Sequence, residues 1–244
     1  TNMSFMFQNI GTSIGNGYNS NINNWNTSNI TDLRGTFGGS STGVTSSFNQ
    51  DINTKSVTIG TGTPVQTTYN AWDVSKVTKF GFAANPNNYL TYGGFYVQGM
   101  FYNNKHFNQP IGNWQINTGS DVYMQDIFAR TRDFNQPISQ SVVTVGTSSY
   151  EAWNVKNVKR FGRMFYRSDY DNFQSIENWQ IGSLALNTKG GLAPFYEMFY
   201  DTTGMLGNLS SSYQPTSGKQ PYISWDMQNV EDLAYMFTYT SENE

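Results

Sequence analysis

The residue best suited to catalysis or metal binding in this 244-residue sequence is its single histidine, His106. A zinc site needs several His, Cys or carboxylate ligands, and a nucleophilic triad needs a histidine beside a nucleophile and an orienting group. No second histidine is available, and the absence of cysteine also removes disulfides and thiol nucleophiles. We therefore interpret His106 as a turn residue and predict neither a metal ion nor a cofactor.

Two pairs of acidic residues, Asp121 with Asp126 and Asp169 with Asp171, have residue types that a glycosidase uses as acid and base. Nothing in the sequence places a group that would raise a pKa beside either pair. The glycine-rich stretches GTSIGNG and GTGTP lack the order of a phosphate-binding loop, and no Asp-x-Asp-x-Asp-Gly calcium loop occurs. The sequence therefore predicts a non-enzymatic protein.

The charge distribution argues against nucleic acid and membrane ligands. Only 13% of the residues are charged, the net charge is -3, and Lys and Arg form no run. Proteins that bind nucleic acid concentrate positive charge in a patch or stripe. No stretch approaches 18 consecutive apolar residues, and no signal peptide opens the chain. We expect no nucleic acid partner and no membrane span.

A repeated phrase indicates how the chain is organised. FNQPI begins at Phe107 and again at Phe134, FNQDI begins at Phe48, and weaker copies begin at Tyr18 and Phe173. The tryptophans mark the same repeat: Trp25, Trp72, Trp114, Trp153, Trp179 and Trp225. Because the indoles keep a fixed place in the repeat, we predict that they pack in the core rather than stack on sugars.

Apolar residues follow four of the tryptophans at fixed distances. A β-branched residue comes after five positions, a large apolar residue after eight and a phenylalanine after twelve, with Ala84 as the exception. A Met-Phe pair closes most units, as at Met100, Met164 and Met198. The 244 residues are therefore predicted to be a single elongated domain of about six to seven irregular units.

The spacing within a unit predicts its local structure. Ile111, Trp114 and Ile116 suit a short strand, and Val158, Phe161 and Phe165 fall on one face of two helical turns. Each unit would then be one strand plus one short helical or 3₁₀ segment. Since one such unit cannot bury both faces, we expect a repeat solenoid of stacked parallel strands, with Asn and Gln side chains forming hydrogen-bonded ladders.

The stretches TNMSFMF, FNQPIGNW, WNTSNITDL and WDVSKVTKF resemble the DUF285 repeat of the BspA-like leucine-rich repeat surface proteins. This repeat is found in mycoplasma lipoproteins, other bacterial surface proteins and some large viruses. The resemblance implies an LRR-like fold and a surface-displayed, non-enzymatic protein associated with adhesion.

Insertions enlarge several units. SVTIGTGTPVQTTYNAW and SVVTVGTSSYEAW, which end at Trp72 and Trp153, both predict a hairpin. A third insertion, residues 83–99, is rich in Tyr, Gly and Asn, a composition typical of contact loops. Its candidate contact residues are Tyr89, Tyr92, Phe95 and Tyr96. The alternative is that these rings pack back on the solenoid.

Two functions fit this organisation. One is a surface scaffold for adhesion that binds a protein or glycan on a host or neighbouring surface, located outside the cell, on the cell surface or on a virion. The other is a structural subunit of a virion, fibre or surface layer. The first and last units lack the polar caps of a solenoid, so we also expect a segment of a longer chain, with head-to-tail neighbouring subunits as further partners.

Overall fold

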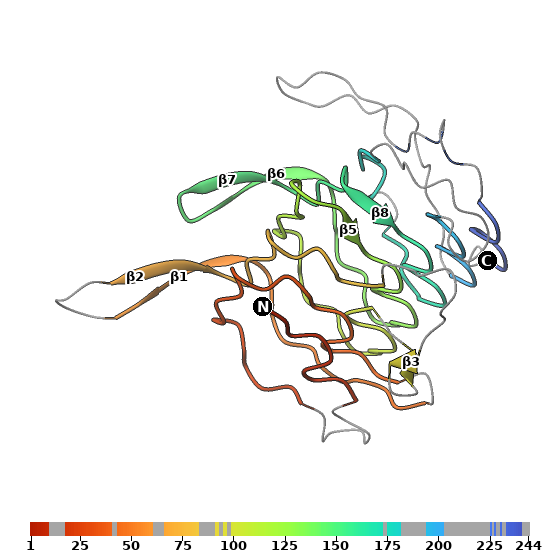
Figure 1. Ribbon diagram of the computed structural model, residues 1–244, viewed down its shortest axis with the longest axis horizontal. Helices are drawn as coiled ribbons and strands as arrows, with labels where there is room; N and C mark the ends of the chain where they lie inside the picture. Colours follow the sequence, from red (N-terminus) through yellow and green to blue (C-terminus); the bar gives the residue numbers. More distant parts are fainter. Residues whose placement is uncertain are drawn as a thin grey trace.

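Figure 1 presents the computed structural model of the chain. The structure describes residues 1–9, 18–40, 43–60, 66–82, 99–172, 175–181, 194–202 and 233–240, the single residues 225, 227 and 230, and the backbone of 91–92 and 95–96. These ranges contain no α-helix. Their strands are β1 (Lys55–Ile59), β2 (Thr67–Ala71), β3 (Thr91–Tyr92), β4 (Phe95–Tyr96), β5 (Val122–Tyr123), β6 (Ser141–Val145), β7 (Ser148–Ala152) and β8 (Val158–Arg160).

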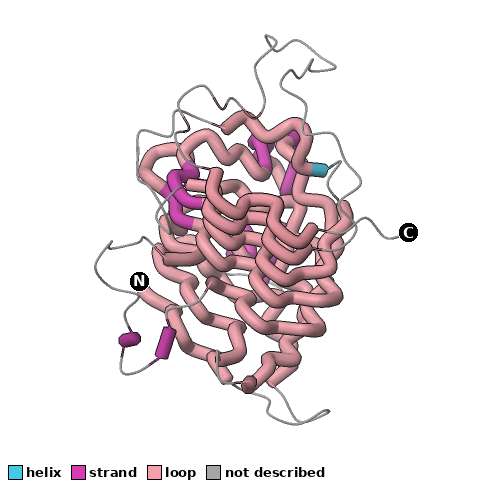
Figure 2. The backbone as a smooth tube through the Cα atoms, turned by 90° about the vertical axis from the view of Figure 1, so that its right-hand side faces the viewer, coloured by secondary structure: helices cyan, strands magenta, loops and turns pink. Residues whose placement is uncertain are grey.

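The part of each unit that carries its closing Phe forms a run of consecutive turns, which we call a turn segment. Turn segments cover residues 3–9, 33–39, 99–104, 124–131, 161–168, 195–202 and 233–240. Alternate N–H groups close a turn within the segment, as Ala129 N–H does by donating to Asp126 O at 3.1 Å. The intervening N–H groups donate to the next segment, as Phe128 N–H does to Met164 O at 3.0 Å. The segments therefore stack in layers joined by backbone hydrogen bonds (Figure 2).

Left-handed backbone conformations make this path. In three successive turn segments, two non-glycine residues four positions apart have φ between 51° and 60°: Asp126 and Arg130, Arg163 and Arg167, Glu197 and Asp201. Each such residue costs on the order of 1 kcal/mol of backbone strain. The hydrogen bonds between layers hold these residues in place.

The predicted helix over Val158, Phe161 and Phe165 is wrong. Val158 lies in β8, and the two phenylalanines lie in a turn segment. Between them, Arg163 has a φ of 56°, which a right-handed helix does not accommodate. The apolar side chains at these spacings still face the interior, because two successive turns also return them to one side.

Aromatic rings fill the interior in columns. The first column contains the closing phenylalanines, with neighbouring ring centroids 5.5–6.0 Å apart: Phe7, Phe37, Phe101, Phe128, Phe165, Phe199 and Phe237. The second contains rings that open the FNQ phrase, 5.8–6.3 Å apart: Phe48, Phe107, Phe134 and Tyr170. Within a layer, rings of the two columns stack at 3.8–4.4 Å. These contacts supply much of the buried apolar area.

The closing residue after Trp72 is Phe101, as its Met-Phe pair predicts. Ala84, the exception to the spacing, lies outside the described residues, and Phe101 takes the column position that follows Trp72. Phe80 and Met100 flank the insertion and are joined directly, because Met100 N–H donates to Phe80 O at 2.8 Å. The tyrosine-rich insertion is thus closed at its base by a hydrogen bond.

The assignment corrected by these columns concerns the phrase that precedes Trp179. The sequence aligned Phe173 with the opening ring, but Tyr170 stacks on Phe134 at 5.9 Å, and Phe173 lies outside the described residues. The hydroxyl groups of Tyr170 and Ser175 are hydrogen-bonded at 2.7 Å. Tyrosine can occupy the column because a buried partner satisfies its hydroxyl.

The tryptophans couple the core to the backbone. Trp72, Trp114, Trp153, Trp179 and Trp225 are buried, and Trp25 is partly buried against the core. Each of the five buried indoles donates its Nε1–H at 2.8–2.9 Å to an isoleucine carbonyl of the preceding unit, namely Ile22, Ile52, Ile111, Ile138 and Ile176 in order. The last four indoles also stack at 5.9–6.2 Å. Each of these five indoles therefore bonds its unit to the unit before it.

The predicted ladder of Asn and Gln side chains is confirmed. Asn49 N–H donates to Asn19 Oδ1 at 2.8 Å, Asn108 N–H donates to Asn49 Oδ1 at 3.0 Å, and Asn135 N–H donates to Asn108 Oδ1 at 3.0 Å. Gln109 adds a second donor to Asn49 at 3.0 Å. Side-chain carbonyls thus satisfy backbone N–H groups where the layers have no regular strand.

Both predicted hairpins are present. Strands β1 and β2 pair antiparallel, as do β6 and β7, and the two hairpins extend from the same side of the stack (Figure 1). The Tyr69 hydroxyl donates to Asn24 O and the Tyr150 hydroxyl to Asn113 O, both at 2.5 Å. Each hairpin is therefore attached to the preceding unit at an equivalent place.

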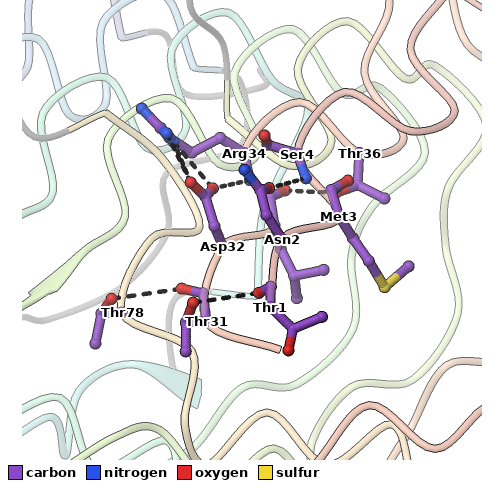
Figure 3. Close-up of polar contacts among 10 residues, drawn as sticks. Thr1, Asn2, Met3, Ser4, Thr31, Asp32, Arg34, Thr36 and Thr78 are labelled. Atoms are coloured by element: carbon purple, nitrogen blue, oxygen red, sulfur yellow. Dashed lines mark hydrogen bonds and ion pairs between the residues drawn. The ribbon is translucent and has the colours of Figure 1, made fainter. Parts of the chain in front are cut away.

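Parallel pairing runs along one edge of the stack but does not include Ile111–Trp114. Bridges link Asn2 to Asp32, Asp32 to Lys79 and Lys79 to Tyr123, and β5 pairs with β8. Figure 3 shows the first layers, where the Thr31 hydroxyl donates to Thr1 O at 3.2 Å and the Thr78 hydroxyl donates to Thr31 O at 3.4 Å. The strand predicted at Ile111, Trp114 and Ile116 is wrong, because Trp114 N–H closes a turn on Ile111 O at 3.2 Å.

Candidate functional site

A pocket of about 300 Å³ is lined by polar and positively charged residues. They are Gly43, Thr45, Asn103, Lys105, Arg130, Arg132 and Arg167. Four of the chain's 14 Lys and Arg residues thus surround one hollow. In a chain with a net charge of -3, this is a local concentration of positive charge.

Stacking of the turn segments brings these cations together. Arg130 and Arg167 both lie two residues after the closing phenylalanine of consecutive segments, and Lys105 and Arg132 both lie four residues after it. Arg130 N–H donates to Tyr166 O at 2.7 Å, which holds the two layers in register. The pocket is therefore a product of the repeat, because equivalent positions of neighbouring layers form its wall.

The uncharged wall is held by Asn103. Its Nδ2 donates to Ser40 O and to Val44 O, both at 3.0 Å, and Ser46 N–H donates to Asn103 O at 3.2 Å. These bonds fix the loop that carries Gly43 and Thr45. The lining of the pocket thus includes uncharged residues held in place by backbone hydrogen bonds.

Most of the positive charge in the pocket is not neutralised by the protein. Arg167 pairs with Asp201, with Nε and Oδ2 3.2 Å apart. Within the described residues, Lys105, Arg130 and Arg132 form no ion pair. The buried Nε of Arg130 also has no hydrogen-bond acceptor there. Three cations are therefore available to an anionic ligand, and such charge-assisted contacts are among the stronger hydrogen bonds.

A separate row of charges is formed by the first left-handed residues of three successive turn segments, which are Asp126, Arg163 and Glu197. Arg163 Nε lies 3.2 Å from Asp126 Oδ1 and 3.7 Å from Glu197 Oε2. The Asp126 and Arg163 atoms are close enough for an ion pair but do not form a hydrogen bond. Burial raises the pKa of the Asp126 carboxyl above its ordinary value, and Arg163 only partly opposes this.

This buried carboxyl gives a testable pH dependence. Because the pKa of Asp126 is raised by folding, the folded chain binds a proton at pH values where the unfolded chain has lost it. As the pH rises from about 4, the unfolding free energy of the natural chain should therefore fall relative to that of Asp126→Asn. The value for the natural chain minus the value for the variant should decrease by up to about 1.4 kcal/mol per pH unit. Urea denaturation of both proteins between pH 4 and 7 measures it.

The exposed Asp121 supplies the matched control for this prediction. Asp121→Asn removes a carboxylate from the surface, where Asp121 Oδ1 lies 3.9 Å from Lys159 Nζ, and so reports the effect of removing an exposed charge. A difference for Asp126→Asn that stays constant or grows with pH would contradict the prediction.

The residues considered for catalysis are not brought together. His106 Nδ1 lies 3.2 Å from Asp133 Oδ2, and both side chains are more than half exposed. Asp121 is exposed while Asp126 is buried beside Arg163, so they do not form an acid pair. In the part of the chain that the structure describes, no group of three His, Asp or Glu residues could hold a metal ion.

The predicted contact loop lies mostly outside the described residues. Tyr89 lies outside the described residues, and of Tyr92, Phe95 and Tyr96 only the backbone is described. Tyr92 pairs with Phe95 in the β3–β4 hairpin. Their contact role stays a prediction.

The pocket is not predictable from the local sequence. Its cations are spread from Lys105 to Arg167, so no run of Lys or Arg marks them. The available signal was their place in the repeat, since Arg130 and Arg167 follow the closing phenylalanine at the same distance.

These features define a class of protein: a chain of stacked turn units joined by backbone and side-chain ladders, with a cationic pocket on its surface. The chain belongs to the family described as Mycoplasma protein of unknown function, DUF285, whose model matches residues 1–83, 65–202 and 195–244. No curated protein and no solved structure matches it. None of its described segments is a helix with the length and apolar character needed to span a bilayer.

Proposed function

We propose that this chain is a non-enzymatic scaffold displayed outside the cell, on a cell surface or on a virion, where it binds a protein or glycan of a host or neighbouring surface. It would be an LRR-like solenoid of the BspA-like class. The observation that carries the proposal is the pocket formed by Lys105, Arg130, Arg132 and Arg167, because it exists only when consecutive units are stacked. A repeat that builds a recognition surface from equivalent positions is suited to binding.

The interior of the layers supports this assignment. Backbone N–H groups and indole Nε1 groups are used to hold one layer on the next. Only outward-facing side chains, hairpins and insertions are left to differ between units. A binding surface can therefore differ between units while the core that holds the layers together stays the same.

A binding survey tests the proposal. The purified chain, immobilised in one orientation, is tested against a glycan array and against extracellular-matrix proteins. We expect saturable binding to at least one ligand, competed by the soluble chain. A folded, monomeric chain that binds none of them would contradict the proposal.

A second candidate is a structural subunit of a virion, fibre or surface layer, and the hairpins favour it. Ile59 on β1 and Val142 on β6 are apolar and more than half exposed. Exposed apolar residues on hairpins with open strand edges suit contacts between subunits. Sedimentation velocity would then show concentration-dependent assembly that Ile59→Thr with Val142→Thr abolishes, whereas the binding scaffold stays monomeric in both forms.

A further inference from the structure

We propose that the pocket formed by Lys105, Arg130, Arg132 and Arg167 binds a sugar residue that carries a carboxylate or sulfate group. The inference rests on the proposed binding function and specifies the ligand class of one site. It is carried by the charge, the size and the polar wall of the pocket.

The charge of the pocket selects an anion with one or two negative groups. Lys105, Arg130 and Arg132 have no ion pair in the described part of the chain, while Arg167 is already paired with Asp201. A second carboxylate, Asp133, directly follows Arg132 and lies beside His106. These acids border the cluster, so positive charge does not continue along the surface as a track for a long polyanion such as RNA.

The arginines favour oxyanions of planar or forked geometry. A guanidinium group can donate two parallel hydrogen bonds to a carboxylate or sulfate, whereas an ammonium group acts as a point charge. The Arg130 guanidinium lies 5.9 Å from the ring centroid of Tyr102, which orients it.

The size and the uncharged wall favour a sugar. A volume of about 300 Å³ lies at the lower end for ligand pockets and holds a single ring rather than a folded peptide segment. Thr45 and the backbone at Gly43 add uncharged hydrogen-bonding groups to the lining. Asn103 holds this wall in place through its bonds to Ser40 O and Val44 O.

Titration of the whole chain with small ligands tests the proposal. Calorimetry or NMR would use glucuronate and galactose 6-sulfate as carboxylate and sulfate probes, with glucose and galactose as neutral counterparts. We expect at least one acidic sugar to bind about tenfold or more tightly than its neutral counterpart, with affinity that falls as salt rises. Comparing the two acidic sugars decides which anionic group the pocket prefers.

Paired substitutions locate the binding. Lys105→Gln with Arg132→Gln should weaken binding of the acidic sugar about tenfold or more, because two charge-assisted contacts are lost. Lys76→Gln with Lys156→Gln removes the same charge from exposed positions outside the pocket and should leave the affinity within about twofold.

Three results would overturn the inference. They are unchanged affinity in the pocket variant, an equal loss in the control variant, and tighter binding of oligouridylate or a phosphoserine peptide than of either acidic sugar. Saturable binding to a protein or neutral glycan, together with no measurable binding of either acidic sugar, would reject this ligand class while leaving the proposed scaffold function intact. If the survey above finds no ligand while an acidic sugar still binds in the pocket, the proposed scaffold function is rejected and the ligand class of the pocket is kept.

Discussion

Replacing Trp114 with alanine should lower the free energy of unfolding by about 3–5 kcal/mol. The Trp114 side chain is fully buried, and its ring centroid lies 5.7 Å from that of Phe80 and 6.1 Å from that of Trp153. Truncation would leave a cavity between layers. It would also remove the hydrogen bond that Trp114 Nε1–H donates to Ile52 O at 2.9 Å. Urea denaturation followed by far-UV circular dichroism measures the loss.

Two further variants separate the causes. Trp114→Phe keeps an aromatic ring but removes the donor, and it should lose less stability than Trp114→Ala. Trp25→Ala should cost less than Trp114→Ala, because Trp25 is only partly buried. If Trp114→Ala unfolds within about 1 kcal/mol of the natural chain, the packing described for the tryptophan column is wrong.

Gly81→Ala should also be strongly destabilising, by about 3 kcal/mol or more, because the new methyl group meets backbone rather than side chain. A Cβ at Gly81 would lie 1.8 Å from Gln125 O and 2.6 Å from Gln125 N. Relief of this clash would separate two layers and break the bonds that Phe80 and Gly81 donate to Tyr123 O at 3.0 and 2.9 Å. Thermal and urea unfolding would both show the effect.

Gly119→Ala is the matched control for the Gly81 prediction. A Cβ at Gly119 would find only the Asn117 side chain, at 3.7 Å, so the unfolding free energy should change by less than about 1 kcal/mol. Equal stability of the Gly81→Ala and Gly119→Ala proteins would show that the layers are not in contact at Gly81.

The layered architecture separates stability from recognition. In residues 126–131, alternate N–H groups bond within the segment and to the next layer, and the closing phenylalanine points inward. The two left-handed positions carry Asp126 and Arg130 here, but Arg163 and Arg167 one layer on. These positions tolerate different side chains because the ladder uses only their backbone, so the outer surface can vary from layer to layer.

The sequence by itself determined the features that depend on repetition. The recurrence of Trp and of the FNQ phrase predicted the buried indoles and the Asn ladder through Asn49, Asn108 and Asn135. Alternating β-branched residues around a Gly-Thr turn predicted the β6–β7 hairpin, because strand pairing there is local. Such features need only the type of residue and its distance from a neighbour in the chain.

Only the tertiary structure decided the path of the turn segments and the existence of the pocket. Apolar residues at Val158, Phe161 and Phe165 fit two helical turns equally well by periodicity, and no glycine marked Arg163 as left-handed. That conformation persists because hydrogen bonds from Arg163 and Phe165 to the next layer, at 2.8 and 2.9 Å, offset its strain. In the same way, Lys105, Arg132 and Arg167 meet only because stacking places residues that are distant in the chain at neighbouring layers.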